Sequence, residues 1–223
     1  MDDLELMKSR QSVRRYTDRP LPAGVISALE AEAEQVNAES GMHIRLMAEE
    51  PAAFQGLEAR YGHFSGVNNY LILAGPRNVP NWEETLGYYG QRLVLKAAEL
   101  GLNSCWVAGT FRRDTVERRL APGDGLACVV ALGYGIKQGV PHKSKPLEEL
   151  CPGVGEAPEW FRRGALGAQL APTAINQQSF RLTRRGDRVK LEDLGGIYSK
   201  IDLGIVRYQF ERLAGKENFT WEE

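Results

Sequence analysis

Two compact apolar runs constrain the fold of this 223-residue chain more than any other feature. Residues 69–74 (NYLILA) and 127–132 (ACVVAL) are each followed by glycine, and their length predicts short strands buried in a sheet. A long helix is predicted between them over residues 83–100, because Leu86, Leu93 and Ala97 recur at helical spacing and Gly101 fits the C-cap. The middle of the chain therefore predicts a strand–helix–strand core.

The rest of the chain alternates helices with short strands. A hairpin is predicted over residues 179–192 with its turn at 185–187, and a short strand over residues 43–47. Residues 102–107 predict a loop or short strand, and residues 135–157, rich in Gly, Pro and Lys, predict a long surface connection. Further helices are predicted at residues 3–9, 22–36, 50–60, 158–170 and 195–213.

Composition and charge exclude several classes of protein. A net charge of −1 and a pI of about 6.4 give no field that would draw the chain to nucleic acid or to an anionic membrane. The N-terminus carries no signal peptide, and no apolar run approaches the ~20 residues of a membrane span, so we expect a soluble, cytoplasmic protein. Neither a disulfide framework nor a metal site is predicted, because no ligand spacing links Cys105, Cys128, Cys151, His43, His63 and His142.

A basic arm near the N-terminus is the first candidate for chemistry. If residues 8–16 are extended, Arg10, Ser12 and Arg14 share one side, and two guanidinium groups flanking a hydroxyl suit a phosphate monoester. From composition alone, a solvated basic stretch is the more common explanation. Nucleic-acid binding is a third reading, which the acidic pI disfavours.

Three further segments offer polar or permissive groups. Lys143 and Lys145 repeat the cation–hydroxyl–cation pattern, either as a second phosphate contact or as ordinary exposed loop lysines. Residues 171–180 (APTAINQQSF) carry a hydroxyl and three amides that could meet the edge of a heteroaromatic ring, although without further context a turn between two elements is the favoured explanation. Gly109 would let a ligand approach the backbone, whereas Cys105 is better explained as a small core residue than as a nucleophile.

Taken together, these segments resemble the nitroreductase family. The motif R-x-S-x-R-x-Y at residues 10–16, followed by a proline and a helix, is typical of that family. Residues 87–109 resemble its core helix and the following loop, ALGYG at 131–135 its strand ending, and KSKPLEE at 143–149 its basic tail. The order and spacing of these motifs carry the resemblance over residues 5–150. It implies an α+β fold with a central mixed or antiparallel sheet flanked by helices.

One departure from the family pattern suggests a fused second half. Family members carry a P-S-x-x-N-x-Q-P-W type motif after the first long helix, which serves the opposite subunit of a homodimer. Here the corresponding stretch lacks it, and the motif is matched instead by Pro172, Thr173, Asn176, Gln178 and Phe180. Residues 1–150 would then form the FMN-binding core, and residues 157–223 a shortened half that mimics the partner. The resemblance thus implies a monomeric pseudo-dimer with one FMN site, with further dimerisation left open.

Short internal matches point the same way. HIRL at residues 43–46 resembles SFRL at 179–182, and Gly87-Tyr88-Tyr89 resembles Gly196-Ile197-Tyr198, each at the start of a predicted long helix. Matches this short also occur by chance, so they suggest a degenerate duplication without establishing it.

The resemblance also implies the roles of the site residues. Arg10, Ser12, Arg14, Lys143 and Lys145 would bind the FMN phosphate and ribityl chain. Pro172, Thr173 and Asn176 would line the isoalloxazine, and the backbone at Ala108 and Gly109 would face its N5 atom. No catalytic side chain is predicted, because the flavin carries the hydride.

The implied reaction is a ping-pong transfer of electrons through FMN. NADH or NADPH would be the donor, and a nitroaromatic, quinone or similar electron-poor small molecule the acceptor. The alternatives are dehalogenation-type reduction and a flavin-binding protein without turnover, used for storage or regulation, because a fold does not fix a reaction.

Overall fold

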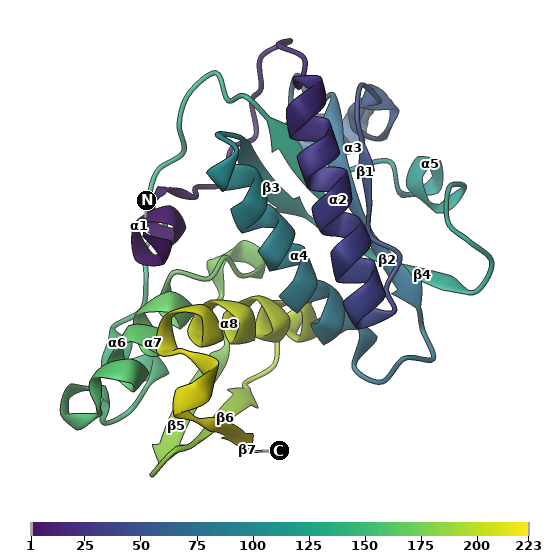
Figure 1. Cartoon of the computed structure of the whole chain (residues 1–223). Helices are drawn as coiled ribbons and strands as arrows, with labels where there is room; N and C mark the ends of the chain where they lie inside the picture. Colours follow the sequence, from purple (N-terminus) through teal and green to yellow (C-terminus); the bar gives the residue numbers. More distant parts are fainter. Residues whose placement is uncertain (1, 223) are drawn as a thin grey trace.

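A computed structural model describes residues 2–222 and shows an α+β fold built on two sheets (Figure 1). The α-helices are α1 (Asp3–Ser9), α2 (Ala23–Ser40), α3 (Leu57–Tyr61), α4 (Trp82–Glu99), α5 (Arg113–Glu117), α6 (Leu147–Leu150), α7 (Glu159–Gln169) and α8 (Ser199–Ala214). The strands are β1 (Arg45–Met47), β2 (Asn69–Pro76), β3 (Asn103–Val107), β4 (Asp124–Gly133), β5 (Phe180–Arg185), β6 (Arg188–Asp193) and β7 (Thr220–Glu222). The predicted fold class is confirmed.

The larger sheet has the strand order β1-β2-β4-β3, with every neighbouring pair antiparallel. Its two central strands are buried on both faces, which explains their continuous apolar sequences. Leu71 and Leu73 point to the face covered by α2 and α4, whereas Tyr70 and Ile72 point to a second apolar cluster on the other face. Period-two alternation therefore divides one apolar run between two cores.

Helix α4 follows its prediction to within one residue at each end. It begins after Asn81, whose backbone is left-handed (φ 53°), and Gly101 follows its end with φ 79°. Leu86, Leu93 and Ala97 are fully buried, as their spacing predicts.

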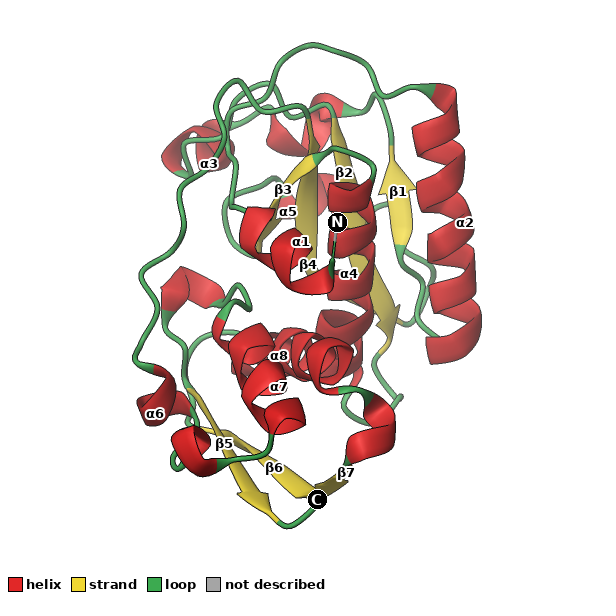
Figure 2. Cartoon of the chain, turned by 60° about the vertical axis from the view of Figure 1, so that its left-hand side comes forward, coloured by secondary structure: helices red, strands yellow, loops and turns green. Residues whose placement is uncertain are grey.

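The C-terminal part pairs α7 and α8 with a small sheet of order β5-β6-β7, in the lower part of Figure 2. The predicted hairpin forms, with Gly186 left-handed in its turn (φ 66°). One apolar core cluster connects this part to the large sheet, since Phe161 and Phe210 belong to the same cluster as Leu73.

Several predicted boundaries were wrong. The last helix begins at Ser199 and not at 195, because Gly195 and Gly196 adopt positive φ values that a helix does not accept. The predicted helix at 50–60 is divided into a 3₁₀ turn (Pro51–Phe54) and α3. Residues 135–157 contain α6 and a 3₁₀ turn (Val154–Glu156), and neither α5 nor β7 was expected.

Helices α4 and α8 cross where one glycine of each helix packs against the backbone of the other helix. A Cβ on Gly87 would clash with the carbonyl oxygen of Ile201, and a Cβ on Gly204 would clash with that of Glu84. Each glycine lies six positions after the residue that precedes its own helix. Each packs against the residue that lies three positions after the start point of the other helix, counted in the same way. Such reciprocity is the geometry of an isologous, two-fold contact.

This contact corrects one predicted internal match. Gly87 had been paired with Gly196, but Gly196 precedes α8 altogether, whereas Gly204 makes the contact equivalent to that of Gly87. The short sequence motif was therefore aligned out of register.

Candidate functional site

A cavity of about 810 Å³ lies where the two parts of the chain meet. Its walls come from the basic arm, the loop after β3, the segment between α7 and β5, and the start of α8. Eight of the ten predicted site residues line it: Arg10, Ser12, Arg14, Ala108, Gly109, Pro172, Thr173 and Asn176.

The arm is held extended by the strands beside it. Ser12 bridges to Ser104 of β3, and the amide of Val13 donates to the Ser104 carbonyl at 3.0 Å. The side chain of Val13 is buried in the core, whereas Arg10 and Arg14 line the cavity. The extended backbone gives the arm the period-two separation expected from the sequence.

Arg10 is the most unusual side chain in the cavity. It is only 5% exposed, and its Nε and Nη1 atoms have no hydrogen-bond partner among residues 2–222. Burial lowers the pKa of Arg10 to about 10, so the group still carries its charge at neutral pH. A buried cation without a counter-ion is costly, and it therefore indicates a site for an anion.

Arg14 adds a second cation to the same wall. Its guanidinium lies 5.9 Å from the centre of the Phe64 ring, and it forms no ion pair with the part of the chain described here. Because Arg10 and Arg14 both lack a carboxylate partner, the arm end of the cavity is distinctly positive.

Asp202 is the one carboxylate among the described residues lining this cavity. It accepts hydrogen bonds from the Ala174 amide at 3.0 Å and from Gln177 Nε2 at 2.8 Å. Burial raises the pKa of Asp202 to about 6, although these two hydrogen bonds act in the opposite direction. Asp202 thus fixes the segment after α7 to the first turn of α8.

The segment after α7 is conformationally strained. Ile175, Asn176 and Gln178 all have positive φ values (46°, 57° and 46°). Thr173 Oγ1 accepts from the Gln178 amide at 3.0 Å, and Asn176 Nδ2 donates to the Lys143 carbonyl at 2.8 Å. Strained backbone of this kind concentrates at functional sites, which favours a binding role over a simple connecting turn.

The loop after β3 offers open backbone. A Cβ at Gly109 would have only the Tyr198 hydroxyl within 4 Å, at 3.8 Å, so a flat ligand can approach the backbone there. Cys105 is buried, and burial raises the pKa of its thiol, which supports a structural role over a nucleophilic one.

Two predicted site residues are not brought to the cavity. Lys145 Nζ lies 3.3 Å from the Gln178 carbonyl oxygen and 3.3 Å from Glu149 Oε1, and Lys143 is exposed. Neither lysine belongs to the cavity wall, because residues 143–145 turn towards α6 and Gln178.

Sequence reasoning missed many other residues of the wall, among them His142, Tyr198 and Asp202. His142 directly precedes the basic stretch that had drawn attention, so its neighbourhood was a usable signal. Tyr198 and Asp202 had no local signal, because only the folding of α8 against the arm side brings them there.

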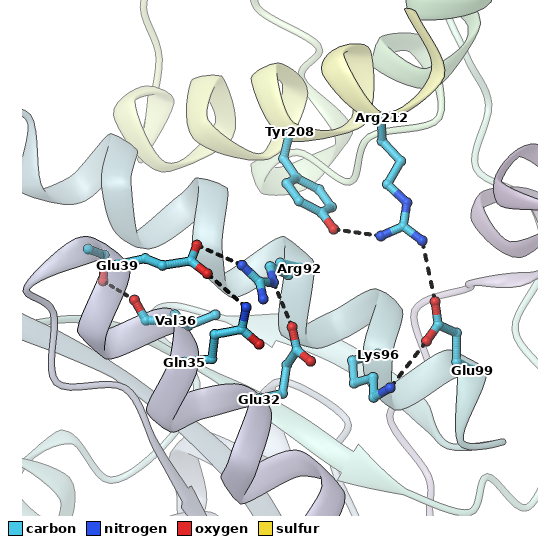
Figure 3. A network of polar contacts seen from close by, with 10 residues as sticks. Glu32, Gln35, Val36, Glu39, Arg92, Lys96, Glu99, Tyr208 and Arg212 are labelled. Carbon is cyan, nitrogen blue, oxygen red and sulfur yellow. Dashed lines mark hydrogen bonds and ion pairs between the residues drawn. The ribbon is translucent and has the colours of Figure 1, made fainter. Parts of the chain in front are cut away.

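A second, smaller cavity of about 320 Å³ lies between the first half of α4 and the last part of α8. Its cations are all compensated: Arg92 bonds Glu32 and Glu39, and Arg212 bonds Glu99, as Figure 3 shows. Lys216 pairs with Glu211 at 2.9 Å. This cavity therefore offers no uncompensated charge to an anionic ligand.

Within residues 2–222, no helix is long and apolar enough to cross a membrane. The same residues contain no cluster of three or more His, Cys, Asp or Glu side chains placed to hold a metal ion.

The fold is that of nitroreductases. A Thermotoga maritima protein named as a nitroreductase superposes with a TM-score of 0.66 at 18% identity, covering 97% of this chain and 85% of its own. An NADH dehydrogenase/NAD(P)H nitroreductase from Parabacteroides distasonis gives 0.54 at 22% identity, over 66% of this chain and 95% of its own. A Desulfovibrio desulfuricans nitroreductase in complex with FMN gives 0.52 at 18% identity, over 66% and 94%.

Family membership follows from the sequence itself. Residues 3–214 match the family model described as "Putative TM nitroreductase", and the chain belongs to this family. The resemblance identified from the arm and the central helix is thereby confirmed. Comparison with curated proteins gave no match.

Proposed function

We propose that this protein is an FMN-dependent oxidoreductase that passes electrons from NADH or NADPH to a small electron-poor acceptor such as a nitroaromatic or a quinone. The observation that carries the proposal is the buried, uncompensated Arg10 beside Ser12 and Arg14 in a nitroreductase fold. A related fold from Desulfovibrio desulfuricans is named as a complex with FMN.

The residues present fit FMN. Two unpaired guanidinium groups and a hydroxyl at one wall match a phosphate monoester, and about 810 Å³ is ample for a cofactor of this size. Arg10, Ser12 and Arg14 would hold the phosphate end. Pro172, Thr173, Asn176 and the backbone of Ala108 and Gly109 would line the ring. Bound FMN supplies hydride chemistry that the side chains lack.

The chain's own part is binding, orientation and exclusion of water. Ile175, Ile197 and Tyr198 line the cavity while remaining 82%, 53% and 42% exposed. Exposed apolar side chains at a cavity indicate a contact surface for an apolar ligand. They would hold a flat acceptor against the ring.

We also propose that residues 1–150 and 157–223 form a pseudo-dimer with one FMN site. The reciprocal packing of Gly87 and Gly204, each against the backbone of the opposite helix, supports a two-fold relation between α4 and α8. Among residues 2–222, every cation of the cavity between α4 and the end of α8 has a carboxylate partner, which argues against a second phosphate site there.

The test is the spectrum of the purified full chain. We expect a yellow protein, or one that becomes yellow with added FMN, that loses its colour when NADH or NADPH is added without oxygen. Colour should return with a nitroaromatic or quinone. A chain that takes up no FMN would contradict the proposal, and bound FMN that neither donor reduces would identify a flavin-binding protein without turnover.

A further inference from the structure

The segment that leads to His142 runs antiparallel to the arm. Gly135 bridges to Tyr16, and the Ile136 amide donates to the Arg15 carbonyl at 2.9 Å. As the segment advances along residues 135–142, the facing arm residue therefore moves back towards the N-terminus.

The pairing continues to the phosphate end of the cavity. A Cβ on Gly139 would lie 2.9 Å from the Ser12 carbonyl oxygen, so the two backbones are in close contact there. Three residues later, His142 reaches the neighbourhood of Arg10, and both side chains line the same cavity. The imidazole of His142 therefore lies at the same cavity as Arg10 and Arg14.

The ring nitrogens of His142 are buried, and no side chain among residues 2–222 is hydrogen-bonded to them; only the backbone at Leu170 and Lys143 lies close enough to interact. Burial, and then the charge of Arg10, lower the pKa of His142, while the backbone at Leu170 and Lys143 acts in the opposite direction. In the absence of an anion the ring is therefore mostly neutral at pH 7 and above.

We propose that His142 is a further phosphate ligand of this site, joining Arg10, Ser12 and Arg14, and that it binds as the imidazolium, so that each phosphate bound takes up a proton from solvent. This inference rests on the proposed function, because it assumes that the cavity holds a flavin phosphate. His142 then takes the place that the resemblance assigned to Lys143 and Lys145.

A bound anion would favour this protonation. The phosphate dianion reverses the repulsive field of Arg10 and gives the imidazolium N–H a strong acceptor. Burial raises the pKa of both Cys105 and Tyr16, so neither supplies a negative charge at neutral pH. The other charged or titratable groups around His142 are Arg10 and Arg14 of the arm, Tyr16, Cys105 and Lys143, together with His63, Tyr198 and Asp202 on the remaining walls of the cavity.

The experiment is calorimetry of FMN binding to the flavin-depleted full chain at pH 7.5, in HEPES and in Tris, whose ionisation enthalpies differ. The second pKa of a phosphate monoester is about 6, so the ligand itself is already dianionic. We expect uptake of about one proton per FMN by the wild type. Riboflavin, which lacks the phosphate, should bind without proton uptake.

Variants assign the proton. His142→Gln should abolish the uptake and weaken FMN binding about tenfold or more, as expected for the loss of a charge-assisted contact, with little effect on riboflavin. His43→Gln is the matched control, because His43 lies on the surface beside Asp124, and it should keep the uptake.

Two results would overturn the inference: FMN bound by the wild type without proton uptake, or undiminished uptake in His142→Gln. In either case FMN still binds, so the proposed function stands. Failure of the wild type to bind FMN would remove both.

Discussion

At the scale of single residues, Arg10 shows that a binding site can lower the stability of the folded chain that carries it. Its guanidinium is desolvated, yet the described chain supplies neither a carboxylate nor a hydrogen-bond acceptor for Nε or Nη1. A folding chain keeps such a group only if something outside it compensates the charge. The arm therefore fits the anion site that we propose, with its cations in place before a ligand binds.

Arg14 provides a direct test of the arm. Arg14→Glu places a carboxylate against the phosphate, so we expect flavin retention to be lost. Reversing the charge should cost about 3 kcal/mol of binding free energy, which corresponds to a decrease in FMN affinity of at least about 100-fold. The measurement is FMN fluorescence quenching on titration. Arg15→Glu is the matched control, since Arg15 is also exposed but does not line the cavity. Equal binding by the Arg14 variant and the wild type would show that the arm has been misread.

Asp202 makes stability depend on pH. Its pKa is about 6 in the folded chain against 3.8 for the free side chain, so folding disfavours the ionised form. Stability should therefore fall as pH rises from about 4 to about 6, by up to about 3 kcal/mol, and remain lower above that range.

Urea unfolding between pH 4 and pH 7 measures this effect. Asp202→Asn does not titrate, so the free energy of unfolding of the variant minus that of the wild type should increase across the range. Asp18→Asn, at an exposed position outside the cavity, should follow the wild-type profile. A constant difference between Asp202→Asn and the wild type would refute the assignment.

At the scale of elements, the crossing of α4 and α8 decides where the cavity lies. The two backbones touch because both contact positions are glycine. Larger residues would push the helices apart and, with them, the α8 end that carries Asp202 and Tyr198.

Alanine substitutions test this crossing. Gly87→Ala and Gly204→Ala should each destabilise the chain by about 1–3 kcal/mol, because each new methyl group meets a backbone carbonyl that cannot move aside easily. Gly24→Ala is the control: in α2 nothing lies within 4 Å of the new Cβ, and alanine is the better helix former, so stability should rise by about 0.5–1 kcal/mol. Chemical denaturation measures the free energy of unfolding. If neither Gly87→Ala nor Gly204→Ala lowered it, the two helices would not be in tight contact at this crossing.

The elements also show what local sequence can predict. Helix α4 was located to within a residue because its apolar face, its length and Gly101 all agree. The predicted start of helix α8 was too early, because Gly195, Gly196 and Tyr198 adopt positive φ values before it. The spacing of apolar residues carries no information about backbone φ. Strand β7 is three residues long and exists only because β6 offers an edge to it.

At the scale of the whole molecule, the two parts share one core and one large cavity. Residues from the arm, from β3 and from the segment after α7 meet there, although about 160 residues separate the first from the last. The cavity-lining residues that we propose for the site all come from one chain.

The stoichiometry follows from this arrangement. We expect one FMN per chain by absorbance after denaturation, and one chain per particle by light scattering. Two tightly bound FMN per chain would refute the pseudo-dimer. A particle of two chains with one FMN each would retain the site and correct only the expected monomer.

The sequence by itself determined the class of fold, the arm, and the two segments that meet it, because period-two and helical spacing and a short motif are local properties. Only the tertiary structure decided which side chains reach the cavity. It replaced Lys143 and Lys145 by His142, and it added Asp202 and Tyr198. The reason is physical: the direction in which a loop turns, and the face that a helix presents, depend on contacts with distant segments that no local pattern records.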